Sequence, residues 1–277
     1  MLKKIKYILE YVGFLVYYHL FRLLPFDIAS NIGAFIGKKI SVFFKANQTA
    51  RQNLAMIFPE KSDEEREQII VDMWDNLGRN IGEFPHIDKI SEEKITVEGA
   101  ENIPKNSGAI IISAHFGNWE ITGIVAKNHL SNPAAIYRKI NNPHIDKAVK
   151  NIRAKFYKGL FVKGNTGLGL AKVLKKNGQL CLLTDQKMNN GIAVDFMGKP
   201  AMTAPIVAYF AKRYDVPIIP VKILRNGTNF IVNVYPEIVT EEGESVDSIM
   251  LKVNQTLEEW IRENPAQWFW VHNRWGN

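Results

Sequence analysis

Cysteine is almost absent from the sequence. Cys181 is the only one among 277 residues, which excludes an internal disulfide and any zinc site built from several cysteines. A chain without disulfides is typical of a reducing compartment. Because Cys181 lies inside the apolar run QLCLLT, we interpret it as a core residue and not as a nucleophile.

The sequence also lacks an uninterrupted apolar run of the about 20 residues that a membrane-spanning helix usually needs. Residues 1–24 come nearest, but Glu10, His19 and Arg22 interrupt them, and many of the remaining residues are Tyr or Phe. Such aromatic side chains favour the boundary between lipid headgroups and hydrocarbon. We therefore predict an interfacial or shallowly inserted helix. A buried core helix of a soluble protein is the alternative.

No small-residue cleavage site follows this segment, which argues against a cleaved signal peptide. Lysines precede it, and further lysines and arginines follow it. Positive charge on both sides does not favour export of the main part of the chain. We expect that part to stay on the cytoplasmic side of a membrane.

Motifs for a serine nucleophile and for nucleotide binding are missing. GxSxG does not occur, which argues against a covalent intermediate on a serine elbow. The glycine run at residues 164–170 matches neither the dinucleotide spacing nor a P-loop, although a helix that begins there could bind a phosphate group. The histidines show no metal-ligand spacing, so we predict no metal site.

Acidic residues are outnumbered by basic ones, and the net charge is +7 with a pI near 9.3. This balance favours an acidic partner, an anionic membrane surface or nucleic acid. No recognised nucleic-acid-binding motif accompanies the charge, so we expect no nucleic acid. The basic segment 144–164 is either an ordinary solvated helix face or a surface for an acidic partner.

The order of helical and strand-like segments indicates the fold class. Residues 26–58 have helical periodicity, and Ser62 with Glu65 forms a helix-capping pattern. From about Ile95, short β-rich runs alternate with helical stretches, which is typical of a sheet covered by helices. We predict an α/β fold with a mixed central sheet flanked by helices. Its parts are an N-terminal helical, membrane-facing region at 1–58 and one α/β domain at 59–277.

One short segment places chemically active residues where a strand ends. The apolar run GAIIISA leads directly to His115, and Gly117 and Asn118 then allow a turn before Glu120. The spacing predicts that Glu120 folds back onto His115, fixes its tautomer and leaves the other ring nitrogen free as a general base. A strand-capping histidine and a helix-capping glutamate with structural roles are the alternative.

The segment HFGNWE (115–120) resembles the H-x-x-x-x-[D/E] motif of membrane-bound acyltransferases. The residues within the motif resemble those of the bacterial lipid A biosynthesis late acyltransferase family. Other segments resemble that family and occur in the expected order. They are RQNLAMIFP (51–59), YRK (137–139), DQ (185–186), VDFMGKPAMT (194–203) and PAQWFWVHNRW (265–275). The resemblance covers essentially the whole chain.

The resemblance implies transfer of a fatty acyl chain to a hydroxyl of a lipid A precursor. The donor would be acyl carrier protein, which carries the chain on phosphopantetheine, and the location would be the cytoplasmic side of a bacterial inner membrane. No further cofactor is implied. His115 would be the general base and Glu120 its orienting partner. Arg138, Arg153 and Asp185 would be substrate-binding or supporting residues near the active site.

The chain departs from the family pattern at two positions. Met197 replaces the second phenylalanine of FFG, and Asn273 replaces an arginine of the HRRW ending, which weakens any phosphate contact there. The PEG motif of glycerolipid acyltransferases is absent from the sequence. An acyltransferase of the same superfamily that acts on a lysophospholipid or another glycolipid remains an alternative. A non-catalytic, membrane-associated scaffold of the same fold is a second one.

Overall fold

Four α-helices precede the first strand in the part of the chain that the structure describes. The computed structural model describes residues 2–41, 43–105, 107–164 and 166–276. The four helices are α1 (Leu2–Leu23), α2 (Phe26–Ser41), α3 (Ala46–Ile57) and α4 (Asp63–Glu83). The capping pattern predicted at the start of α4 is confirmed, because Ser62 and Glu65 each accept a hydrogen bond from the backbone N–H of the other.

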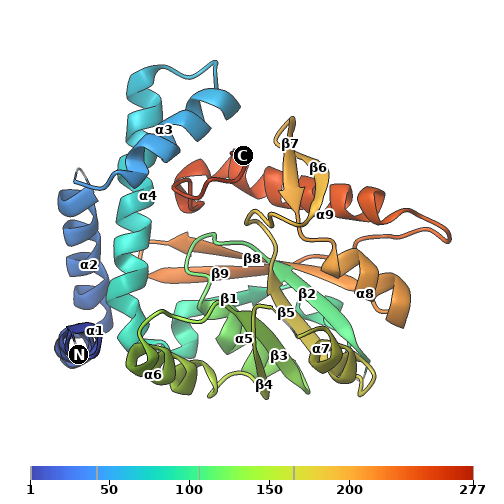
Figure 1. The fold of residues 1–277 in the computed structure, drawn as a ribbon, viewed down its shortest axis with the longest axis horizontal. Coiled ribbons are helices and arrows are strands. Elements are labelled where there is room, and N and C mark those ends of the chain that lie inside the picture. Colours follow the sequence, from blue (N-terminus) through green and yellow to red (C-terminus); the bar gives the residue numbers. More distant parts are fainter. Residues whose placement is uncertain (1, 42, 106, 165, 277) are drawn as a thin grey trace.

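Helices α2 and α4 lie side by side along one flank of the molecule (Figure 1) and meet through glycines. Gly33 and Gly37 of α2 face Gly78 and Gly82 of α4. A Cβ atom on any of these four residues would overlap backbone atoms of the other helix. The two backbones are therefore in direct contact, which only glycine permits.

The centre of the protein is a seven-stranded mixed sheet in the order β1-β9-β8-β2-β5-β3-β4. Strands β8, β2, β5, β3 and β4 are parallel to one another, and β9 with β1 runs the opposite way. The strands are β1 (Ile95–Glu98), β2 (Ala109–Ser113), β3 (Pro133–Tyr137), β4 (Gly159–Val162), β5 (Gln179–Leu183), β8 (Ile218–Asn226) and β9 (Asn229–Val234).

Helices cover both faces of the sheet, and each face has its own apolar core. Helices α5 (Ile121–His129) and α6 (Pro143–Arg153) pack on one face. Helices α7 (Gly167–Leu174), α8 (Ile206–Tyr214) and α9 (Val246–Glu263) pack on the other. A third core joins α3 and α4 to the C-terminal segment and to a hairpin of β6 (Ile192–Phe196) and β7 (Lys199–Thr203). Four short 3-10 helices connect these elements: η1 (Phe84–His86), η2 (Glu92–Lys94), η3 (Ala100–Asn102) and η4 (Pro265–Gln267).

The predicted fold class, an α/β fold with a mixed central sheet flanked by helices, is confirmed. The β6–β7 hairpin is absent from the prediction. Thr203 ends β7, and α8 begins at Ile206, directly after Pro205. The division of the chain between residues 58 and 59 stays a prediction.

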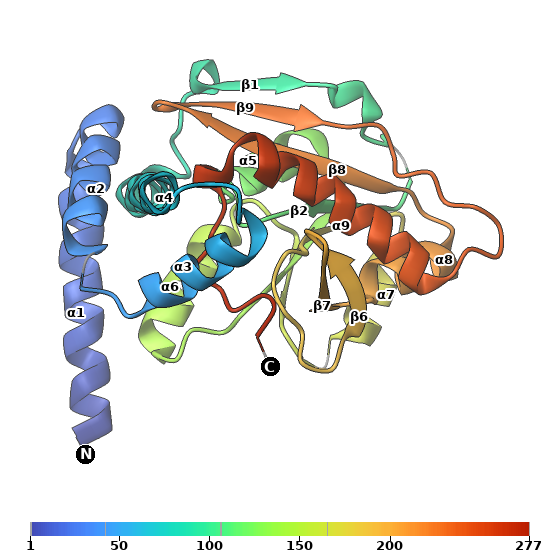
Figure 2. The same cartoon turned by 90° about the horizontal axis from the view of Figure 1, so that it is seen from above.

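Helix α1 differs from the others because none of its described residues is buried. The alternative reading of residues 1–24 as a buried core helix is therefore wrong. Figure 2 shows that α1 continues past the body of the protein towards the N-terminus. Within the described ranges, no helix has both the length and the apolar character needed to cross a membrane.

Candidate active site

The carboxyl ends of β2, β3 and β5 meet at one edge of the sheet, where a cavity of about 1200 Å³ opens. This is the edge at which open α/β sheets bind ligands. His115, Glu120, Arg138 and Arg153 all line the cavity. Small-molecule pockets typically measure roughly 300–1,000 Å³, so this one has room for a long chain as well as polar groups.

Strand register brings His115 and Asp185 together. Ser113, the last residue of β2, lies opposite Leu183, the last residue of β5, and each of the two polar residues lies two positions beyond the end of its strand. The His115 backbone N–H donates to Asp185 Oδ2 at 3.0 Å, and the ring Nδ1 lies 2.9 Å from Asp185 Oδ1. The other ring nitrogen, Nε2, faces the side-chain amide of Gln186 at 3.3 Å. Nδ1 is thus the protonated nitrogen and Nε2 the free base.

Asp185 is buried but fully hydrogen-bonded. Its Oδ2 also accepts a hydrogen bond of 2.9 Å from the indole N–H of Trp268. Burial would raise the pKa of this carboxyl, but the charge and the hydrogen bonds of His115, together with that of Trp268, lower it to about 2. Asp185 therefore stays ionised at neutral pH, where it can stabilise a protonated His115.

The structure corrects the predicted partner of His115. Glu120 does not take the orienting position, which Asp185 occupies. The carboxylate of Glu120 instead forms a two-bond ion pair with the guanidinium of Arg153 from the end of α6, and its Nε–Oε2 distance is 3.1 Å. At the end of the turn after His115, the backbone N–H of Glu120 donates to Asn118 Oδ1 at 3.1 Å. The side chain of Glu120 then lies beside α6. A catalytic role for Glu120 stays a prediction.

A buried polar network holds the turn that carries His115. Gly117 has φ +55°, and its carbonyl accepts a hydrogen bond from Asn80 of α4 at 2.7 Å. The Asn118 side chain donates to Glu83, the last residue of α4, at 2.7 Å. Glu83 also forms a buried ion pair with Arg225 of β8. The active-site turn is therefore fixed by the N-terminal helices and by the sheet together.

The mouth of the cavity is positively charged. Arg138, exposed at the end of β3, lines it with Lys139 and with Lys163 from the end of β4. Arg153 also lines the cavity and is paired with the carboxylate of Glu120. Burial would lower the pKa of Arg153, but the charge of Glu120 raises it, so its guanidinium stays protonated. Cations in this arrangement suit phosphate groups or an acidic protein surface.

From His115 the cavity continues inwards as an apolar arm between the sheet and α5. Ile111, Ala135 and Cys181 line the arm from three neighbouring strands, and Val125 and Ala126 line it from α5. All five are buried. Burial raises the pKa of the Cys181 thiol to about 12, so the thiol stays neutral and contributes an apolar wall. Such a lining offers apolar contacts and, among the five side chains named, no charged group.

Several aromatic residues lie in or near the cavity. Trp119 lines the cavity, whereas Phe116 and Phe196 lie in the core beside the C-terminal tryptophans. Nothing in the sequence alone indicates a site role for His272, or for Trp268, whose indole N–H donates to Asp185. His272 in fact lines the cavity, and burial lowers its pKa. The only sequence signal for Gln186 was its place beside Asp185 in the DQ pair.

The family of bacterial lipid A biosynthesis acyltransferases matches residues 1–277. The chain is 26% identical over 270 residues to a lipid A biosynthesis palmitoleoyltransferase of Escherichia coli (strain K12), which covers 91% of this chain and 86% of that protein. It is 23% identical over 175 residues to a phosphatidylinositol mannoside acyltransferase of Mycolicibacterium smegmatis, with 61% and 57% covered. A crystal structure of the 1-acyl-sn-glycerophosphate acyltransferase of Thermotoga maritima aligns with a TM-score of 0.42 at 16% identity, over 88% of this chain and 100% of that one.

Proposed function

The chain belongs to the bacterial lipid A biosynthesis acyltransferase family and is an acyltransferase. From this premise we propose that it moves a fatty acyl chain from acyl carrier protein to a hydroxyl of a lipid A precursor. The observation that carries the proposal is the place of His115. Its unprotonated Nε2 faces Gln186 in a cavity whose lining includes both the cations of the mouth and the apolar arm.

In the proposed reaction, His115 Nε2 takes the proton of the acceptor hydroxyl as that oxygen attacks the thioester carbonyl carbon of the donor. A carbon–oxygen bond forms and the carbon–sulfur bond breaks. The leaving thiolate of phosphopantetheine then receives the proton from the imidazolium. Asp185 holds the ring through Nδ1 and stabilises its positive charge between the two proton transfers.

The donor is proposed to place its acyl chain in the apolar arm and its carrier at the mouth. Burying a chain in the arm contributes about 0.8 kcal/mol for each methylene. The phosphate of the phosphopantetheine arm and the acidic surface of the carrier protein match Arg138, Lys139 and Lys163. The Glu120–Arg153 pair lies between the mouth and the arm, where it can contact the acceptor.

We further propose that the protein lies on the cytoplasmic side of a bacterial inner membrane through α1 and α2. Lys3, Lys4 and Lys6 are exposed beside the exposed apolar side chains of these helices. An apolar helix face flanked by lysines is typical of helices that lie in a lipid interface. The exposed apolar residues include Leu2, Leu9, Val12, Val16, Leu20 and Leu23 of α1 and Ile28, Phe35, Ile36 and Ile40 of α2.

The proposal is tested with purified protein, acyl carrier protein carrying a labelled acyl chain, and a tetra-acylated lipid A precursor. We expect the precursor to gain the mass of one acyl chain. His115→Ala should lower the rate about 10²–10⁴-fold, the usual contribution of a general base. His129→Ala, at the end of α5 and outside the set of residues that line the cavity, is the matched control and should keep the wild-type rate.

Two results would change the proposal. Equal rates for the wild type and for His115→Ala would refute the role of His115. Transfer to a lysophospholipid or to a mannosylated phosphatidylinositol, with none to the lipid A precursor, would keep the chemistry and replace the acceptor. The second acceptor enters the assay because a relative of this chain is named for acyl transfer to a phosphatidylinositol mannoside.

A further inference from the structure

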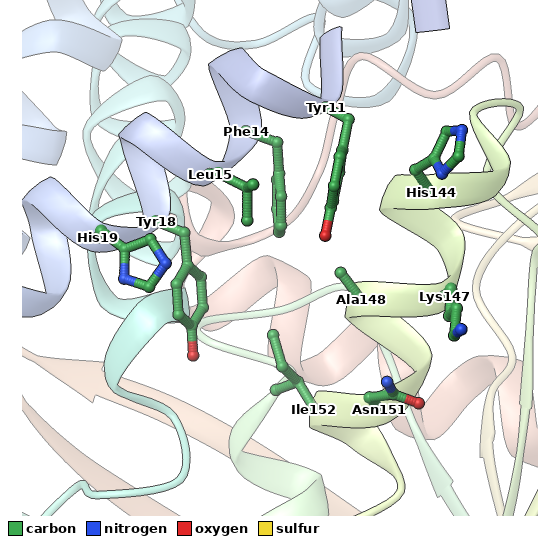
Figure 3. A pocket seen from close by; sticks show the side chains of 10 residues that line it. All are labelled: Tyr11, Phe14, Leu15, Tyr18, His19, His144, Lys147, Ala148, Asn151 and Ile152. Carbon is green, nitrogen blue, oxygen red and sulfur yellow. The ribbon is translucent and has the colours of Figure 1, made fainter. Parts of the chain in front are cut away.

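A second hollow lies outside the active-site cavity, between α1 and α6. Its volume is about 410 Å³. Figure 3 shows Tyr11, Phe14 and Tyr18 of α1 directed towards α6, which contributes His144 and Lys147 to the opposite wall. We call this hollow the α1–α6 groove. It has no part in the proposed acyl transfer.

The groove is held open by polar contacts at both of its ends. Near one end, the Asn142 side chain at the start of α6 donates to the carbonyl of Tyr7 at 2.8 Å and to Glu10 Oε2 at 2.9 Å. Near the other, Arg22 of α1 forms an ion pair with Asp88, and the Tyr17 hydroxyl donates to the carbonyl of Ile81 at 2.5 Å. These contacts attach α1 to the start of α6 at one end, and to α4 and the segment after it at the other.

The lining of the groove matches an anion. Lys147, His144, His19 and Asn151 supply nitrogen donors, and none of the described residues that line the groove carries a carboxylate. Asp146 of the same helix is buried and accepts a hydrogen bond from the backbone of Ile140 at 2.9 Å. Lysine binds phosphate groups as a point charge, and the other nitrogen donors line the same groove from both helices.

The surroundings of the groove match an amphiphile. Tyr and Phe side chains form its α1 wall, and such residues favour the depth of lipid headgroups. The neighbouring side of α1 exposes the apolar residues Leu9, Val12 and Val16, each half exposed or more. A molecule with its phosphate at Lys147 can therefore lay hydrocarbon tails along α1, where a soluble phosphate ester makes no comparable contact.

We propose that the α1–α6 groove binds the phosphate headgroup of an anionic glycerophospholipid of the bilayer. The inference rests on the proposed membrane location of the protein but not on the proposed reaction. Helix α6 is the wall shared with the active-site cavity, because Ile152 lines the groove and Arg153 lines the cavity. A lipid in the groove would hold α6 at the membrane surface.

Co-sedimentation with vesicles tests the proposal, using the full-length protein and comparing phosphatidylcholine vesicles with vesicles that also contain phosphatidylglycerol. Ala148→Trp fills the groove without a change of charge, and Lys147→Glu reverses its cation. Lys150→Glu is the matched control, because Lys150 is equally exposed on α6 but lies outside the groove. We expect the wild type to prefer phosphatidylglycerol, and Ala148→Trp and Lys147→Glu to weaken that preference about tenfold, as expected for one lost charge-assisted hydrogen bond.

Lys150→Glu should weaken the preference clearly less than Lys147→Glu does. Equal losses in the two charge variants would mean diffuse attraction to the membrane surface and would overturn the site, as would an unchanged preference in Ala148→Trp. Soluble glycerol phosphate is added as a competitor. If it removes the preference of the wild type for phosphatidylglycerol vesicles, the ligand of the groove is a free phosphate ester and not a lipid. Acyl transfer to detergent-dispersed substrates is measured on the same variants, so failure of the site is distinguished from failure of the proposed function. Melting curves confirm that each variant is folded.

Discussion

Replacing Asp185 by asparagine tests whether this residue sets the protonation state of His115. Asp185 Oδ2 accepts both the His115 backbone N–H and the Trp268 indole N–H, so the oxygen of an asparagine can keep both bonds. Its amide nitrogen then faces His115 Nδ1 and donates to it. The imidazole proton must move to Nε2, and the nitrogen that faces the cavity is no longer a base.

We expect Asp185→Asn to lower kcat about 10²–10⁴-fold through this wrong tautomer. A stability effect accompanies it. The pKa of Asp185 is lowered from 3.8 to about 2 in the folded protein, which corresponds to roughly 2 kcal/mol of stability at neutral pH. Because the folded pKa is the lower one, this stabilisation is present above pH 4 and is lost as the pH falls towards 2. The difference in unfolding free energy between wild type and variant should shrink over the same range.

The assay is steady-state acyl transfer, together with urea unfolding at pH 7 and at acidic pH. Asp185→Ala separates the two effects, because it leaves the His115 and Trp268 donors unpaired and should cost a further 1–3 kcal/mol or so for each. Glu120→Gln is the second comparison and leaves the His115 tautomer unchanged. Retention of more than about a third of kcat in Asp185→Asn would refute the reasoning. Collapse of kcat in Glu120→Gln alone would restore the sequence-based assignment.

Three further outcomes are expected from buried or strained positions. Glu83→Gln removes the charged partner of the buried Arg225 and should lower the free energy of unfolding in urea by about 3–5 kcal/mol. Glu67→Gln changes an exposed pair and should lower it by less than about 1 kcal/mol. Similar losses in the two variants would show that the turn does not depend on the network. Gly117→Ala should lower the melting temperature and the rate of acyl transfer, because φ is +55° and a Cβ would overlap the carbonyl of Ile223. Gly13→Ala, in a helix with free space around it, should be neutral or stabilising by up to about 1 kcal/mol, so an equal loss in both would contradict the strain argument. Cys181, whose thiol pKa is raised by burial to about 12, should resist thiol reagents in the folded protein and react in denaturant; fast labelling of the folded protein would contradict its burial.

The sequence was sufficient for the fold class because alternating helical and strand-like runs are local signals. The end of β2 and its histidine could be located for the same reason. The partner of His115 could not be read locally. Glu120 is five residues away along the chain, but the contact is made by Asp185, seventy residues away, through the register of β2 with β5. Register between strands that are distant in the sequence depends on the whole sheet.

The C-terminal segment and the β6–β7 hairpin show a second limit of local reasoning. Trp268 lies among apolar neighbours in the sequence, and nothing local indicates that its indole N–H reaches a carboxylate. Met197 lies at the hairpin turn with φ +60°. Methionine rarely adopts this left-handed conformation, so its presence in the sequence does not indicate a turn. Arg274 is fully buried against Phe196, with its guanidinium on Thr203, whereas Asn273, the departure from HRRW, is exposed.

The direct contact of the α2 and α4 backbones has a practical consequence for protein engineering. Deleting residues 1–41 to obtain a water-soluble enzyme would bare the glycines of α4 and remove Ser30, whose hydroxyl donates to Glu83. Because Glu83 also holds Asn118 in the turn that carries His115, the deletion would loosen that turn as well as remove the proposed membrane-binding helices. Solubility is better sought by exchanging outward-facing residues such as Leu9 and Phe35 for polar ones, which leaves the contacts between the N-terminal helices and the candidate active site in place.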